Sequence, residues 1–248
     1  MEWTHFLLLF GVGAVAGFIN VNAGGGSSLT LPTLIFMGLD AAAANGTNRI
    51  GLVLQNVFAV ASFKKNKVHD FKKSSFLALF TLPGAVIGAL AATQVSNTLF
   101  QKILGAVLLF IVVSMFLGRS YKDENSKIHR KQSWLIYPAL FGIGFYGGFL
   151  QVGVGFLFMA ALYHLLRVNL VRVNMHKVFI ILIYTIPAFA IFLFTGNVNW
   201  GYGLVLAAGN GIGGWWGARA AVKGGEKIIR IILALAIIIM AMKLFGLF

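Results

Sequence analysis

The feature that most constrains this chain is an apolar stretch, residues 17–32, whose centre holds the three successive glycines Gly24, Gly25 and Gly26. Each interior glycine costs a helix about 0.8–1 kcal/mol relative to alanine, so we expect no continuous helix through this centre. In hydrocarbon, an unpaired backbone amide costs several kcal/mol, and broken backbone is tolerated only where it faces protein or a water-filled cavity. We therefore expect the chain to be organised around this break and around a second one at residues 151–155.

The composition indicates an integral membrane protein. Hydrophobic residues make up 59% of the 248 residues and charged residues only 10%. At about 20 residues for each pass, this length allows about eight to ten membrane-spanning segments and no soluble domain of normal size. The formal net charge of +14 would suggest nucleic acid in a soluble chain. Here the basic residues lie in loops between apolar runs, so we expect no nucleic-acid partner.

The apolar runs and the loop charges predict how the chain is threaded. The runs cover residues 3–21, 27–39, 44–63, 74–92, 99–118, 134–150, 156–166, 173–195, 200–221 and 228–248. The second and seventh runs are too short to span about 30 Å, so each should form a hairpin of short or broken helices with the run before it. Lysine and arginine gather after the third, fifth, seventh and ninth runs, which predicts that these four connections are cytoplasmic. The uncharged connections 93–98 and 196–199 and both termini are then outside.

The two halves of the sequence resemble each other at a spacing of about 128 residues. The matched pairs are Gly17 with Gly148, Phe18 with Phe149, Gly24 with Gly155, Arg49 with Lys177, Gly84 with Gly213, Gly88 with Gly217, Ala91 with Ala220 and Ala92 with Ala221. Because each half holds an odd number of runs, the halves enter the membrane in opposite directions. The predicted fold is an all-α membrane protein, a polytopic helical bundle of two inverted repeats with broken or re-entrant first hairpins. Residues 1–118 form the first repeat, 119–133 a cytoplasmic linker and 134–248 the second, inverted repeat.

Arg49 is the basic residue that the threading explains least, because it lies inside an apolar run. An ionisable group within a membrane segment is by default a functional hypothesis. The planar guanidinium could bind two oxygens of one anion at once. Lys177, at the matching place in the other half with His176 beside it, would supply a second positive charge. A role as an anchor at the membrane surface is the alternative for both cations.

Neutral groups at the two breaks complete the candidate site. A helix beginning near Ser27 would point free amides and the positive end of its dipole into the membrane, and Ser27 or Ser28 could cap it or bind an anion. The alternative is a re-entrant turn without a ligand. Polar side chains near the breaks are costly unless paired, so some of them satisfy the broken backbone and others line the site. The predicted substrate-binding residues are Arg49, Asn20, Asn22, Gly24, Gly25, Gly26, Ser27, Ser28, Asn48, Gln55, Gln151, Gly155, His176 and Lys177.

The acidic residues and cysteine are informative by their positions and their absence. No aspartate or glutamate lies in the middle of an apolar run, so no carboxylate is obviously placed to bind a coupling sodium ion or proton. The chain has no cysteine, which excludes disulfides and thiolate metal sites. We predict no catalytic residue, no metal ligand and no cofactor. A cavity with basic and neutral donors and no acid is electrostatically an anion site.

Several features together resemble the TauE/SafE family of sulfite and organosulfonate exporters. They are the glycine-rich hairpin 17–32, the following stretch 41–48, the basic loop that leads into residues 74–92 with Pro83-Gly84, and the duplicated layout. The resemblance covers essentially the whole chain. It implies a multi-pass transporter of the cell inner membrane that carries small anions, usually sulfur oxyanions or sulfonates. Family members differ in the sulfur compound that they carry.

The resemblance and the anion-site argument together predict a secondary membrane transporter, and not an enzyme. We expect an exporter of a small sulfur-containing anion such as sulfite, thiosulfate or an organosulfonate, which works by alternating access of the halves around one site. Its partners are the small anion and the lipid bilayer, and the sequence indicates no particular oligomeric state. One alternative is an anion channel with the same lining. A remote alternative is an intramembrane hydrolase that uses Ser27 or Ser28 with a histidine.

Overall fold

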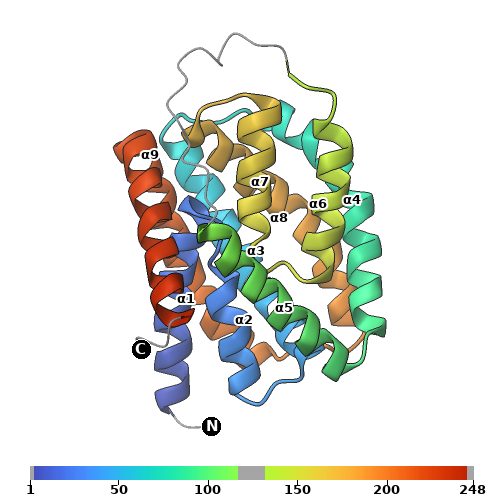
Figure 1. Ribbon diagram of the computed structural model, residues 1–248. Coiled ribbons are helices and arrows are strands. Elements are labelled where there is room, and N and C mark those ends of the chain that lie inside the picture. Colours follow the sequence, from blue (N-terminus) through green and yellow to red (C-terminus); the bar gives the residue numbers. More distant parts are fainter. Residues whose placement is uncertain (1–2, 117–131, 245–248) are drawn as a thin grey trace.

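The computed structural model describes residues 3–116 and 132–244, and within these ranges the regular structure is entirely helical (Figure 1). The helices are α1 (Trp3–Asn22), α2 (Ser27–Phe36), α3 (Ala41–Lys65), α4 (Phe71–Gln94), α5 (Asn97–Phe116), α6 (Ile136–Phe149), α7 (Val154–Ala161), the π-helical turn η2 (Leu162–Leu166), α8 (Leu170–Phe194) and α9 (Trp200–Leu244). Among these, α1, α4 and α8 are long and apolar enough to cross a membrane. The predicted class, an all-α membrane protein, is confirmed.

The helices pack in reciprocal pairs. Extensive contacts join α1 to α9 and α4 to α6, so that the first helix of each half lies on the fourth apolar run of the other. In the centre, α3 packs on α9, α8 packs on α4, and α3 and α8 contact each other. Figure 1 shows α1 and α9 at one side of the molecule and α4 and α6 at the other. The first helix of each half thus has its partner in the other half, while the inverted orientation of the halves stays a prediction. Residues 119–131 of the predicted linker lie outside the described residues.

Small residues allow the paired helices to approach closely. A Cβ atom added at Gly88 would lie only 2.0 Å from the carbonyl oxygen of Phe145 in α6. One added at Gly213 of α9 would lie 2.1 Å from the carbonyl oxygen of Ala14 in α1. The glycines that the sequence spaces four apart are therefore packing positions, at which helix backbones touch directly.

One predicted interruption is wrong. The sequence pattern separated the last two apolar runs at residues 222–227, whereas helical structure continues through this segment in α9. The segment contains lysine and glutamate, which favour helix, and no proline. Gly224 and Gly225 weaken a helix there without preventing it.

The two connections without charge both lie near the start of α3. The Ala41 amide donates to Asn97 Oδ1 at 2.8 Å, and the Asn199 amide donates to Thr47 Oγ1 at 2.9 Å. At the other end of α3, the Lys65 ammonium lies 5.6 Å from the ring centroid of Trp215 in α9. The side of the membrane on which each connection lies stays a prediction.

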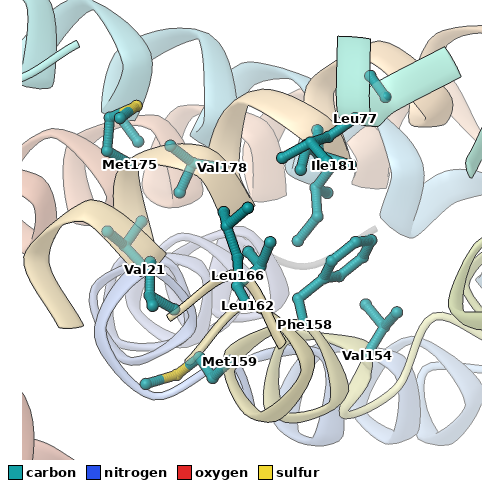
Figure 2. Close-up of a cluster of buried hydrophobic side chains, with 14 of the residues drawn as sticks. Val21, Leu77, Val154, Phe158, Met159, Leu162, Leu166, Met175, Val178 and Ile181 are labelled. Carbon is teal, nitrogen blue, oxygen red and sulfur yellow. The ribbon is translucent and has the colours of Figure 1, made fainter. Parts of the chain in front are cut away.

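An apolar cluster holds the short second hairpin in place. Figure 2 draws part of this cluster, to which Val21 contributes from the end of α1, Phe158 from α7 and Ile181 from α8. Buried apolar side chains stabilise such contacts by about 1.5–3 kcal/mol each. The end of the first broken helix is therefore fixed against α7 and α8 by ordinary hydrophobic packing.

Candidate functional site

The two broken hairpins meet at their glycines. The first break separates α1 from α2, and the second separates α6 from α7. Gly24 has φ of +91°, and a Cβ atom added to it would lie 2.3 Å from the carbonyl carbon of Gly155. A Cβ atom added at Gly155 would lie 2.3 Å from the Cα of Gly24. The backbones of the two breaks are in direct contact, and neither position has room for a side chain.

The first break is held by the polar residues beside it. The Gly26 amide donates to Asn20 Oδ1 at 3.3 Å, and the Ser28 hydroxyl donates to the Gly25 carbonyl oxygen at 2.6 Å. Helix α2 begins at Ser27, as predicted, but its N-cap is Gly26 and no side chain caps it. The prediction that a serine caps this helix is therefore wrong. Gly26 already has helical angles, φ −57° and ψ −36°, so the Ser28 hydroxyl reaches back to a carbonyl instead of a free amide.

The second break is held by a residue of the other half. Gln151 has φ of +58° and donates from Nε2 to the backbone oxygen of Asn45 at 2.9 Å and to its Oδ1 at 2.8 Å. Asn45, in α3, in turn donates from Nδ2 to the Phe149 carbonyl oxygen at 2.8 Å. The Tyr146 hydroxyl donates to the Val152 carbonyl oxygen. Side chains thus satisfy the carbonyl oxygens of Phe149 and Val152, while the amides of Leu150, Gln151 and Val152 donate to backbone oxygens.

Arg49 lies wholly inside the protein, with 0% of its surface exposed. Its Nη2 donates to the Gly148 carbonyl oxygen and lies 3.4 Å from that of Gly147, at the end of α6. The guanidinium carbon is 4.7 Å from the ring centroid of Phe192. Nε and Nη1 have no hydrogen-bond partner among the described residues. A cation beside the carbonyl end of a helix is stabilised by the helix dipole, but two of its donors stay free.

Lys177 makes the reciprocal contact. Its side chain is 1% exposed, and Nζ donates to the Asn20 carbonyl oxygen at 3.1 Å and to that of Val21 at 2.8 Å, at the end of α1. Each half thus sends one cation to the carbonyl end of the other half's broken helix. A surface anchor would extend its charge to water. That alternative does not fit two side chains whose charged ends are buried on backbone carbonyls.

The remaining predicted residues divide into two groups. Asn22 donates from Nδ2 to the carbonyl oxygens of Phe18 at 2.9 Å and Gly217 at 3.1 Å, which ties α1 to α9. His176 lies with Nδ1 2.8 Å from the Ser74 hydroxyl of α4. Both side chains have structural partners, although Oδ1 of Asn22 has none among the described residues.

Asn48 and Gln55 keep free polar atoms. Both amide atoms of Asn48 are buried and have no partner among the described residues. Gln55 accepts a hydrogen bond from Asn20 Nδ2 at 3.1 Å, while its Nε2 has no partner in the same part of the chain. Buried amides without partners are costly, so these atoms are available to a ligand or water.

Sequence reasoning missed two buried polar residues of this interior. Tyr184, in α8, is fully buried, and its hydroxyl has no partner among the described residues. Asn210, in α9, is buried with its backbone against Gly17 of α1. Both lie in the middle of an apolar run. For the amide of Asn210 that position was a signal that could have found it, whereas a tyrosine in an apolar helix gives no such signal.

The fold and its buried cations define a helical membrane protein of the transporter type, in which broken helices meet inside the protein. Residues 9–244 match the family described as sulfite exporter TauE/SafE. The chain belongs to this family of membrane transporters, and the resemblance seen in the sequence is confirmed.

Individual relatives extend the same match over nearly the whole chain. A probable membrane transporter protein of Haemophilus influenzae is 29% identical over 239 residues, which cover 96% of this chain and 93% of the relative. The probable membrane transporter protein ORF9 of a Sinorhizobium species is 31% identical, with 97% of this chain and 92% of the relative covered. YfcA of Escherichia coli K12, also named a probable membrane transporter protein, is 28% identical, with 96% and 88% covered. No solved structure matches the chain.

Proposed function

We propose that this protein is a secondary transporter of the inner membrane that exports a small sulfur-containing anion, such as sulfite, thiosulfate or an organosulfonate. The observation that carries this proposal is the pair of buried cations, Arg49 and Lys177. They come from opposite halves and lie where the broken helices end.

The electrostatics of the pair favour an anionic ligand. A charge buried away from water is costly unless it is paired. The partners of Arg49 and Lys177 are backbone carbonyl oxygens, which carry only partial charge, and no carboxylate is among their hydrogen-bond partners in the described residues. A bound anion would supply the missing negative charge.

The donors match an oxyanion better than a spherical ion. Arginine presents several N–H groups in one plane and binds two oxygens of one group at once. Nε and Nη1 of Arg49 are free among the described residues, and each shares an edge of the guanidinium with Nη2, so an oxyanion that took over a carbonyl contact of Nη2 would be bound through two oxygens. The family description names sulfite as cargo, and sulfite has this arrangement of oxygens. The relatives are named only as transporters, so the sulfur compound rests on the donors and the family description.

Transport by alternating access is the mechanism that fits the reciprocal packing. Gly24 and Gly155 close the two breaks against each other, and each cation belongs to one half while it holds the other. Rocking of one half, or of its hairpin, would separate these contacts and open the site first to one side and then to the other. No covalent step is needed.

Purified protein in proteoliposomes tests the proposal. Flux of sulfite, thiosulfate, sulfate and methanesulfonate is measured against empty liposomes, with increasing substrate and with substrate preloaded inside. We expect saturable flux of at least one sulfur anion, which an internal load of the same anion accelerates. Flux that never saturates and shows no counterflow would favour the anion-channel alternative. No flux of any sulfur anion would overturn the proposed cargo.

The hydrolase alternative has no support in the contacts. The Ser28 hydroxyl donates to a backbone oxygen within the first break. The serine–histidine contact that the described residues do form joins Ser74 to His176, between α4 and α8. The proposed function therefore includes no catalytic serine.

A further inference from the structure

We propose that Tyr184 is a substrate-binding residue whose hydroxyl donates to the same anion as the Arg49 guanidinium, and that the two together select anions with an SO₃ group. This inference rests on the proposed function, because it concerns the ligand of the same site.

The first observation is the state of the hydroxyl itself. Tyr184 is fully buried, and its hydroxyl oxygen has no hydrogen-bond partner among the described residues. A buried tyrosine hydroxyl usually has a partner. Leaving such a group unpaired weakens the folded state, and a bound ligand that accepts from the hydroxyl would offset this cost.

The second observation is that the hydroxyl and the guanidinium lie at the same glycine. A Cβ atom added at Gly147 would lie 2.6 Å from the Tyr184 hydroxyl oxygen. Arg49 Nη2 lies 3.4 Å from the carbonyl oxygen of Gly147. One small ligand could therefore contact both.

The third observation is that the ring is fixed. The Tyr184 ring stacks on Phe158 of α7, with centroids 5.9 Å apart and planes at 18°. Phe158 belongs to the apolar cluster of Figure 2. A donor on a ring held in this way loses little conformational entropy on binding, and it connects the ligand to the short helix of the second hairpin.

The donor geometry indicates the class of ligand. Arg49 has a free nitrogen on each edge of its guanidinium, and Tyr184 offers one O–H from a different side chain. Donors on two side chains match an anion with several oxygens on one centre, such as the SO₃ group of sulfite, thiosulfate and sulfonates. Chloride, which is a single atom, and thiocyanate, which is linear, have no such set of oxygens.

The test is Tyr184→Phe in the full-length protein, which keeps the ring on Phe158 and removes only the hydroxyl. Tyr137→Phe is the matched control, because its ring also packs on a phenylalanine, Phe80, with centroids 4.5 Å apart. Binding of sulfite and methanesulfonate is measured by calorimetry in detergent, with thiocyanate as competitor. We expect Tyr184→Phe to weaken binding of both SO₃ anions by about ten- to a hundredfold. Its thermal stability should be unchanged or higher, and Tyr137→Phe should bind like the wild type.

A second variant reaches the same hydroxyl from the backbone. Gly147→Ala would place a methyl group 2.6 Å from the hydroxyl oxygen, so it should displace the hydroxyl and weaken SO₃ binding similarly. Wild-type affinity in Tyr184→Phe, together with a loss in Arg49→Ala, would overturn the role of Tyr184 and leave the proposed function standing. If Tyr184→Phe weakened the binding of thiocyanate, measured by competition, as much as the binding of the SO₃ anions, the proposed selectivity would be overturned. No anion binding by the wild type would refute the proposed function itself.

Discussion

At the level of single residues, the site contains a buried cation that uses only some of its hydrogen-bond donors. Arg49 uses one nitrogen on backbone carbonyls and leaves two without partners in the described part of the chain. Carbonyl oxygens lower the cost of burying the guanidinium without neutralising it. The unpaired half of the side chain is the part that a substrate can use.

Replacement of Arg49 tests this division. Arg49→Ala should weaken substrate binding about ten- to a hundredfold, because a charge-assisted partner contributes roughly 1.5–3 kcal/mol. Arg49→Lys should recover only part of the affinity, since a point charge cannot reproduce the planar fork. Binding or flux is normalised to correctly folded protein from size-exclusion chromatography.

Lys177→Ala is measured alongside, because Lys177 makes the reciprocal contact. We expect it also to weaken binding, since the second positive charge of the site is lost. Wild-type affinity in both variants would contradict the cationic site and leave only the glycine breaks as anion-binding elements.

The two cations could be predicted from sequence, and their partners could not. A basic residue inside an apolar run is visible as an anomaly, which is how Arg49 and Lys177 were found. The atoms that they bind are backbone carbonyls, which every residue has and no pattern distinguishes. Tyr184 was missed for a related reason, because tyrosine suits an apolar helix and only the packed structure leaves its hydroxyl without a partner.

At the scale of elements, glycine positions decide how closely α4 and α6 approach. A Cβ atom added at Gly144 would lie 2.2 Å from the Thr81 carbonyl oxygen, whereas one at Gly142, two residues earlier in α6, meets nothing within 4 Å. Gly144→Ala should therefore destabilise the protein by about 1–3 kcal/mol or more. Gly142→Ala should be neutral or stabilising by up to about 1 kcal/mol. The unfolding temperatures of the two variants in detergent test this prediction, and equal changes would contradict the close contact at Gly144.

The elements were predicted well where length and glycine content decide them. The short helices α2 and α7 follow from apolar runs that cannot span a bilayer, and the breaks before them follow from glycine and from unpaired backbone. The gap inside α9 was predicted from charge alone. Charge indicates contact with water, and a helix can continue into water, so this signal does not mark a helix end.

At the scale of the whole molecule, the loop charges predict which connections share a side of the membrane. Single cysteines at Lys65 and Asn197 can be placed in this naturally cysteine-free chain. A membrane-impermeant thiol reagent should label Lys65→Cys only from the cytoplasmic side and Asn197→Cys only from outside. Ser96→Cys should behave like Asn197→Cys. Labelling of Lys65→Cys and Asn197→Cys from the same face would refute the inverted repeat.

The duplication is predicted from the sequence because the matched glycines recur at spacings of 129–131 residues. The way the halves exchange partners could not be predicted. Contacts of α1 with α9 and of α6 with α4 join segments that are far apart in the chain. Sequence similarity between halves indicates that they fold alike, without indicating whether each packs on itself or on the other.

The reciprocal contacts of the two cations have a consequence for synthesis on the ribosome. Arg49 is made 99 residues before Gly148, whose carbonyl oxygen it binds, which corresponds to a delay of about 5–20 s at about 5–20 residues per second. An arginine at the centre of a membrane helix costs about 2.5–3.5 kcal/mol on the insertion scale. Lys177 faces no such delay, because its acceptors at Asn20 and Val21 precede it by 157 and 156 residues. We therefore expect the nascent first half to carry an uncompensated charge until the second half, made later, supplies its acceptors.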